Sequence, residues 1–292
     1  MPITLLANVT SLTAQRQLRT SQGSLETSLE RLSSGSRINR AADDAAGLGI
    51  SENLKADIRS LAQAQRNAND GISMTQVAEG AMNEMQGIVG RMRELAVQSS
   101  NGTLGATERG YIQTEFEELK AEIGRLANVT EFNGTKLLDG TASAGLDIQI
   151  GIHATADDRL TLEIAKLSAS TLGTNAASAT SGASAIAAAF IASQSLSTAS
   201  AARLALSVFD NAVQSLSNAR AKVGAVQSRM AVAVTNLASA HENLSAANSR
   251  IRDVDVASET ANMTRYQILT QAGVAVLGQA NQLPALALSL LG

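Results

Sequence analysis

The sequence contains no cysteine, no tryptophan, two prolines and only 2% aromatic residues among its 292 positions. Without cysteine, the chain can form neither a disulfide nor a thiolate metal site. With so few aromatics, its 45% hydrophobic content comes mainly from alanine, leucine, valine and isoleucine. These residues suit long helices better than a thick globular core, so helix is the expected element over most of the chain.

Concentrated charge and long apolar runs are missing as well. The net charge is −3, and no cluster of lysine and arginine marks a nucleic-acid or membrane surface. No apolar run reaches the roughly 18 residues of a membrane span, and the start of the chain lacks the basic region of a secretory signal. We therefore expect no nucleic-acid partner, no membrane insertion and no export by the general signal-peptide route.

Residues suited to catalysis or metal binding are few. His153 and His241 are the only histidines, and neither has the second histidine that a helical zinc site requires. The acidic pairs lack the liganding pattern of a calcium loop, and either Asp43 or Asp44 is expected to cap the helix that follows. We expect no catalytic residue, no metal site and no cofactor.

The most regular pattern is a seven-residue repeat in the C-terminal third. A large apolar residue recurs at every seventh position from Phe209 to Ile251, and a small or slim residue follows three places after each. This repeat predicts a long supercoiled helix packed against a partner, and the large–small alternation lets helix backbones approach closely. The rod-packing residues assigned from the repeat are Leu216, Val223, Met230, Leu237, Leu244, Ala233 and Ala240.

Apolar stripes with helical spacing also occupy both ends of the chain, and they need a shared partner. Two further stripes, from Met74 to Leu95 and from Ile112 to Leu126, flank a polar turn near residues 101–105. They predict a helical hairpin that faces the heptad helix. The residues singled out in the two end stripes are Leu18, Leu25, Leu29, Leu32, Leu269, Val276, Leu283 and Leu290.

The middle of the sequence changes character. Residues 146–152 and 160–164 alternate like strands, and residues 168–184 form a low-complexity stretch of alanine, serine, threonine and glycine. The predicted fold class is mainly α. It is a long antiparallel helical rod or coiled-coil bundle with a small β-containing tip, in which the N- and C-terminal helices are paired.

Several separate blocks of the sequence resemble bacterial flagellins. Residues 28–48 contain SLERLSSGSRIN and then AADDAAGL, which is similar to the N-terminal signature of that family. The blocks GRMRELAVQ at 90–98 and FNGTKLL at 132–138, and the C-terminal stretch from Ser249 to Leu291, match further family blocks in the right order. The resemblance covers about residues 1–140 and 200–292.

The resemblance implies an extracellular subunit that polymerises head to tail into the flagellar filament for motility. Residues 1–42 and 253–292 would be inner-tube helices, disordered in the monomer; residues 43–140 and 196–252 would form an outer-tube helical rod, and residues 141–195 a short variable tip. Export would use the flagellar secretion channel without a cleaved signal peptide. The implied partners are other copies of the chain, the export apparatus and its chaperone, and the hook-junction and cap proteins.

Three residues carry a second implication of the resemblance. Arg91, Leu95 and Glu115 match the positions through which flagellins of this type contact the Toll-like receptor that senses flagellin. Each residue also has a purely structural interpretation, because Leu95 ends an apolar stripe and the other two fit solvated helix charges.

Two alternatives to a filament subunit are considered. A flagellin-like hook–filament junction protein shares the end helices but usually departs from the AADDAAG and C-terminal blocks, which this chain keeps. An enzyme embedded in a flagellin scaffold needs an inserted domain with nucleophile or metal-ligand motifs, and the short middle contains none. The chain is therefore predicted not to be an enzyme.

Overall fold

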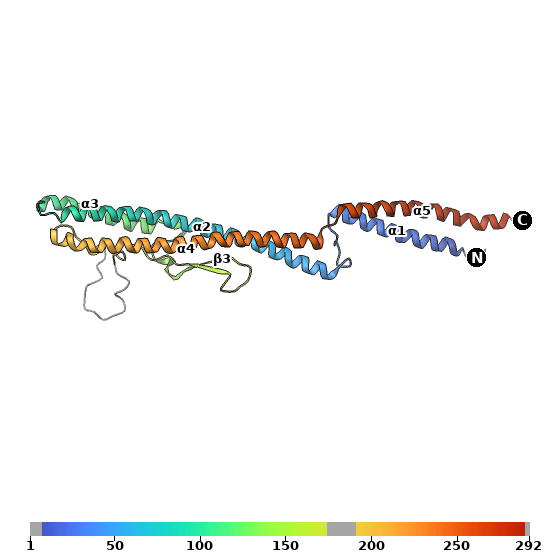
Figure 1. Ribbon diagram of the computed structural model, residues 1–292, viewed down its shortest axis with the longest axis horizontal. Helices are drawn as coiled ribbons and strands as arrows, with labels where there is room; N and C mark the ends of the chain where they lie inside the picture. Colours follow the sequence, from blue (N-terminus) through green and yellow to red (C-terminus); the bar gives the residue numbers. More distant parts are fainter. Residues whose placement is uncertain (1–7, 174–190, 290–292) are drawn as a thin grey trace. The chain divides into compact units, whose positions relative to one another are not determined.

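The computed structural model describes the backbone of residues 8–173 and 191–289 and the side chains as far as residue 282. Most of this part of the chain is helical (Figure 1). Its α-helices are α1 (Val9–Ser34), α2 (Ala45–Ser99), α3 (Ala106–Val129), α4 (Ala199–Arg252) and α5 (Val256–Ser289). None of these described helices is long and apolar enough to cross a lipid bilayer.

Short antiparallel strands form two hairpins between α3 and α4. The first pairs β1 (Glu131–Phe132) with β2 (Thr135–Lys136), and the second pairs β3 (Leu146–Gln149) with β4 (Arg159–Leu162). Two 3-10 turns, η1 (Thr141–Ala144) and η3 (Ile191–Ser193), complete this region. The predicted mainly α fold with a small β part is therefore confirmed, although most of the low-complexity stretch at 168–184 lies outside the described residues.

The chain divides into two compact units, one of residues 1–58 and 242–292 and one of residues 59–241. The second unit has its core where α2, α3 and α4 meet. Phe116 of α3 and Phe209 of α4 pack edge to face, with ring centroids 5.9 Å apart, and both side chains are fully buried. A row of buried methionines on α2 fills the irregular space beside them, a role that suits this flexible side chain. The row consists of Met82, Met85 and Met92.

The heptad repeat of α4 is buried to different depths along its length. Phe209, Leu216, Val223 and Met230 are almost completely buried, and Leu237 is buried slightly less. The small residues follow the same trend, since Ala212 and Ala219 are buried whereas Ala233 and Ala240 are half-buried. Leu244 is also half-buried. The large–small alternation therefore packs most closely in the first half of α4.

The β3–β4 hairpin lies against α2 and α4 at Gly71. A Cβ atom at Gly71 would come within 2.7 Å of both the Ile148 Cδ1 and the Met230 Sδ atoms. The missing side chain therefore creates the space in which β3 and α4 approach α2. Leu160 and Leu162 of β4 are buried while their neighbours are exposed, as expected for a strand with one face on a core.

Candidate assembly and recognition surfaces

The first unit contains a connector, residues 35–44, that joins α1 to α2. Helix α1 ends at Gly35, which adopts the left-handed conformation common at helix C-termini, with φ 70°. Ser36 then forms a β-bridge with Asp253, and the Arg37 N–H donates to the Arg252 carbonyl at 2.6 Å. The connector therefore runs beside the short link between α4 and α5, and its Ile38 side chain is buried.

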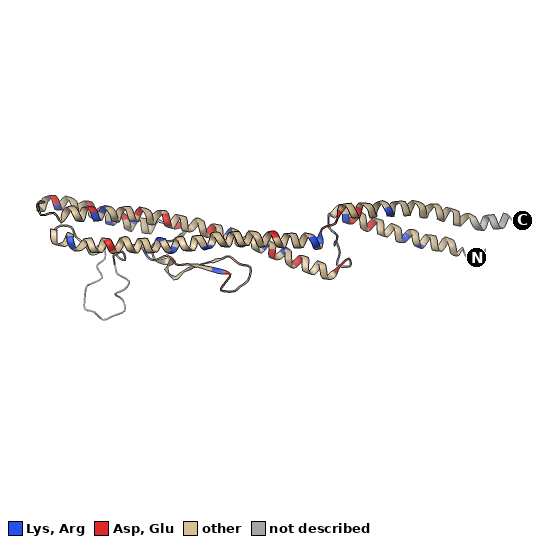
Figure 2. Cartoon of the chain, viewed as in Figure 1, with Lys and Arg blue, Asp and Glu red and all other residues tan. Residues whose placement is uncertain are grey.

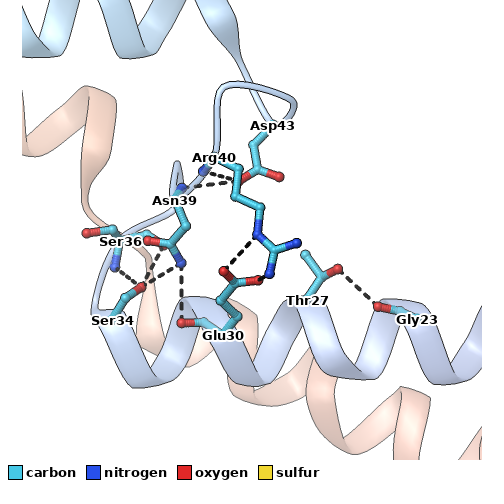
Figure 3. A network of polar contacts seen from close by, with 8 residues as sticks. All are labelled: Gly23, Thr27, Glu30, Ser34, Ser36, Asn39, Arg40 and Asp43. Atoms are coloured by element: carbon cyan, nitrogen blue, oxygen red, sulfur yellow. Dashed lines mark hydrogen bonds and ion pairs between the residues drawn. The ribbon is translucent and has the colours of Figure 1, made fainter.

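Polar contacts fix the conformation of this connector (Figure 3). The Asp43 carboxylate accepts the backbone N–H groups of Arg40 at 3.0 Å and Asn39 at 3.1 Å. These two hydrogen bonds, Arg40 first, lower the pKa of Asp43 below its ordinary value. Arg40 reaches back to α1 and pairs with Glu30 at 2.9 Å. The neighbouring Asp44 caps α2 by accepting the Gly47 N–H at 2.8 Å, so the two adjacent carboxylates have different roles.

Helices α1 and α5 pack together along an interface that we call the terminal seam. On α1 the seam includes Ser11, Ser21 and Ser28, which are all buried. At its outer end the Ser11 hydroxyl donates to the Asn281 side-chain oxygen at 2.7 Å, and the Asn8 amide donates to the Ala280 carbonyl at 2.8 Å. The expected pairing of the N- and C-terminal helices is confirmed, and its most buried α1 positions are serines.

The α5 side of the terminal seam follows a heptad spacing that the sequence analysis did not detect. Its members are half-buried or buried, and Gly273 approaches Leu18 so closely that a Cβ atom there would lie 3.2 Å from the Leu18 Cδ1 atom. Apolar periodicity alone does not reveal this series, because three of its seven members, Glu259, Thr270 and Gly273, are charged, polar or lack a side chain. The members are Glu259, Met263, Tyr266, Thr270, Gly273, Leu277 and Ala280.

The residues predicted from the end stripes are distributed over two surfaces. Leu18, Leu25 and Leu32 are half-buried at heptad spacing on α1, whereas Leu29 is exposed. On α5, Leu269 is 45% exposed and Val276 is 58% exposed, so these side chains point away from α1. The Leu283 side chain and the whole of Leu290 lie outside the described residues.

Helix α5 carries an apolar surface without charge. Ile268 is exposed together with Leu269 and Val276 on one side of the helix, and we call these three residues the α5 apolar surface. No charged residue follows Arg265 in the sequence, and α5 beyond its first turns shows neither red nor blue in Figure 2. Exposed apolar side chains gathered on one helix are typical of a surface that packs against another protein.

Helix α1 presents a different, hydroxyl-bearing surface. Thr13, Thr20 and Thr27 are exposed at seven-residue intervals. Each hydroxyl donates to the carbonyl four residues earlier, at 2.9, 3.1 and 3.0 Å respectively. The bond from Thr27 to Gly23 is visible in Figure 3. We call this series the α1 hydroxyl ladder.

The residues predicted to bind a receptor lie together in the second unit. The Arg91 guanidinium on α2 donates to the Glu115 carboxylate on α3 at 2.8 Å and to Glu94 at 3.0 Å. These contacts, Glu115 first, raise the pKa of Arg91 above its ordinary value. Both Arg91 and Glu115 are about half exposed, whereas Leu95 is only 1% exposed and belongs to the core beneath them. The accessible part of this predicted site is therefore an ion pair.

The two histidines have local structural surroundings. The His153 backbone N–H donates to Asp158 in the β3–β4 loop at 3.0 Å, and His241 is half-buried on α4. Among the side chains that the structure describes, no three acidic or histidine groups gather where they could hold a metal ion.

The described part of the chain has paired terminal helices, a long helical bundle and an exposed apolar surface on α5. These features are typical of a helical structural protein that packs against other chains. Comparison with known proteins identifies the family to which the chain belongs. The bacterial flagellin N-terminal helical region matches residues 5–143, and the bacterial flagellin C-terminal helical region matches residues 206–291. The chain belongs to the bacterial flagellin family, whose members are structural subunits of the extracellular flagellar filament.

Individual relatives agree along nearly the whole chain. Flagellin of Bacillus subtilis is 42% identical and flagellin of Halalkalibacterium halodurans is 41% identical, each over 97% of this chain and 98% of the relative. The flagellar filament 33 kDa core protein of Treponema phagedenis is 41% identical over the same shares. Among solved structures, Bacillus cereus flagellin matches 59% of this chain and 88% of its own, with 27% identity and a TM-score of 0.46.

Proposed function

We propose that this flagellin polymerises head to tail by burying the α5 apolar surface against neighbouring copies. Three exposed aliphatic side chains, on a helix that carries no charge after Arg265, support this proposal. Burying each contributes about 1.5–3 kcal/mol, and together they offset part of the entropy lost when α1 and α5 are ordered. A contact between unlike surfaces that does not close on itself yields an open helical filament.

The same proposal assigns the two groups of helices to nested layers. Helices α1 and α5, within residues 1–42 and 253–292, form the inner tube. The helices within residues 43–140 and 196–252 form the outer tube, and residues 141–195 lie between them in sequence as the variable part. Export through the flagellar secretion channel with a chaperone, and contact with the cap and hook-junction proteins, belong to this assignment.

Polar substitution on α5 tests the polymerisation proposal. The double change Leu269→Gln and Val276→Gln removes apolar side chains that α1 does not cover, so helix content by circular dichroism should stay at the parent level. Filament formation, followed by light scattering and negative-stain microscopy, should be abolished. Thr264→Gln at an exposed polar position of α5 is the matched control and should assemble normally.

Assembly of the double variant at the parent concentration would contradict the assignment of this surface. The same assay distinguishes a filament subunit from the alternative, a hook–filament junction protein. Such a protein would end or join filaments and would not extend them, so the unmodified chain would form no long polymers by itself.

We also propose that the ion pair of Arg91 and Glu115 contacts the flagellin-sensing Toll-like receptor, with Leu95 supporting both helices from the core. The pair is accessible and joins α2 to α3, which gives the receptor a charged patch with a fixed geometry. Arg91 keeps its charge under all physiological conditions, so recognition should not depend on pH in the neutral range.

A neighbouring ion pair provides the control for the receptor proposal. Arg93 pairs with Asp210 at 2.7 Å, and both side chains are about as exposed as those of Arg91 and Glu115. Arg91→Ala with Glu115→Ala should lower the response of a receptor-reporter cell at least several-fold. Arg93→Ala with Asp210→Ala should not. Equal responses from the two double variants would remove Arg91 and Glu115 from the recognition surface.

A further inference from the structure

Asparagine precedes glycine at two places in the sequence, Asn101-Gly102 and Asn133-Gly134. Such a pair can react with itself, because glycine has no side chain to hinder its own backbone nitrogen. The nitrogen attacks the side-chain carbonyl carbon of asparagine, and a five-membered succinimide ring forms as ammonia leaves. Water then opens the ring at either carbonyl and yields aspartate or isoaspartate. The two sites differ in the backbone geometry that controls ring closure.

Asn101 lies in the exposed turn between α2 and α3. Its side-chain Oδ1 atom accepts the backbone N–H of Thr103 at 3.2 Å. This hydrogen bond turns the side chain toward the following backbone, and it places a donor at the oxygen that becomes negative when the ring closes. A Cβ atom at Gly102 would have no neighbour within 4 Å, so no other part of the protein packs against this side of the turn.

Asn133 is held in a different conformation. It and Gly134 form the two-residue turn between β1 and β2, with φ 49° for Asn133 and 77° for Gly134. Positive φ at both positions is the geometry of a type I′ hairpin turn. Ring closure would require Asn133 to rotate out of this geometry and would disturb the pairing of Phe132 with Thr135. The hairpin therefore opposes the reaction at Asn133.

We propose that Asn101 is a self-modification site, at which the folded protein converts asparagine to aspartate and isoaspartate, whereas Asn133 is protected by its hairpin. In the first step the Gly102 nitrogen forms a bond to the Asn101 Cγ atom and loses a proton. The bond from Cγ to the side-chain nitrogen breaks, and ammonia carries the proton away. In the second step one water adds across a ring C–N bond. No oxidant, metal or enzyme takes part.

The product alters the local contacts of the turn. The Arg109 guanidinium donates to the Asn101 carbonyl at 2.8 Å and to the Ser99 carbonyl at 3.0 Å. A carboxylate formed at Asn101 lies near the positively charged Arg109 guanidinium. The attraction between the two charges stabilises the converted form of the residue. In isoaspartate the backbone runs through Cβ and Cγ, which adds a methylene group, and the former Asn101 carbonyl becomes a free carboxylate. The turn should therefore become more mobile while Arg109 keeps its contact with the Ser99 carbonyl.

Peptide mass spectrometry of the full-length protein tests the proposal. Purified chain is incubated at mildly alkaline pH and body temperature and then digested, and isoaspartate is labelled with an isoaspartyl methyltransferase. The peptide containing Asn101 should convert at least several-fold faster than the peptide containing Asn133. Gly102→Ala adds a methyl group where space is open and should slow conversion at Asn101 without changing the thermal unfolding midpoint.

The same incubation in concentrated denaturant is the control for local sequence. Both pairs are Asn-Gly, so in the unfolded chain their rates should become similar. Conversion of Asn133 as fast as Asn101 in the folded protein would overturn the proposal. A Gly102→Ala variant that converts as fast as the parent would also overturn it.

Discussion

At the scale of single residues, Gly71 shows how a missing side chain positions three elements. Glycine in a helix interior usually costs about 0.5–1 kcal/mol relative to alanine, so alanine would normally be favoured there. At Gly71, however, a Cβ atom would lie 2.7 Å from both Ile148 and Met230. Crowding of this kind typically costs about 1–3 kcal/mol. The steric term is the larger one, which explains a glycine in the middle of α2.

Gly71→Ala should therefore lower the free energy of unfolding by about 1 kcal/mol, after the gain in helix propensity is subtracted. Gly80→Ala, on the same helix but with open space around the added methyl group, should raise it by roughly 0.5–1 kcal/mol. Urea unfolding followed by circular dichroism measures both. Equal stabilisation by the two substitutions would show that Ile148 and Met230 simply move aside.

At the scale of elements, the helices differ in how far their packing could be predicted. The α4 repeat was recognisable because large apolar residues occupy it, and the structure buries Leu216, Val223 and Met230. The α1 side of the terminal seam was recognisable only in part, because its leucines give an apolar signal whereas Ser21 and Ser28 between them do not.

The candidate sites were predictable to different degrees. The sequence placed Arg91 and Glu115 on neighbouring helices, but the burial of Leu95 depends on how α2 meets α3 and α4. Which of Asp43 and Asp44 caps α2 also depends on the path of the connector, because both carboxylates precede the helix. Local propensity limits such choices, and tertiary contacts decide them.

The large–small alternation on α4 gives a graded prediction. Ala212→Leu should lower the free energy of unfolding by about 1–3 kcal/mol, because a fully buried alanine leaves no room for a larger side chain. Ala233→Leu, at a half-buried position, should cost less, and exposed Ser239→Leu should change stability by less than about 0.5 kcal/mol. Thermal unfolding of the monomer measures all three. If the three variants were equally harmless, the heptad would not be a packing pattern.

At the scale of the whole molecule, the two units differ in the residues that hold each of them together. The unit of residues 59–241 has a fully buried aliphatic and aromatic core, whereas in the terminal seam of the other unit the leucines of α1 are only half-buried and its buried α1 positions are serines. Apolar burial provides most of the free energy of folding, so the core-bearing unit should persist when the terminal helices are lost.

A chain ending after Ala261 tests this expectation. It lacks most of α5 but keeps the whole of residues 59–241, so circular dichroism should show that α2, α3 and α4 remain helical. Thermal unfolding of this core should keep its midpoint to within a few degrees, while no filaments form under conditions in which the full chain polymerises. Polymerisation of the shortened chain would show that α5 is not the assembly element.

The α1 hydroxyl ladder has a mechanical consequence. A threonine hydroxyl that bonds the carbonyl four residues earlier competes for the acceptor of a helical hydrogen bond, and helices tend to bend at such places. Seven residues are close to two full helical turns, so bends at Thr13, Thr20 and Thr27 are expected to point in nearly the same direction. The small bends therefore add instead of cancelling. We therefore expect the three hydroxyl groups to give α1 an intrinsic curvature, which would suit the wall of the inner tube proposed above.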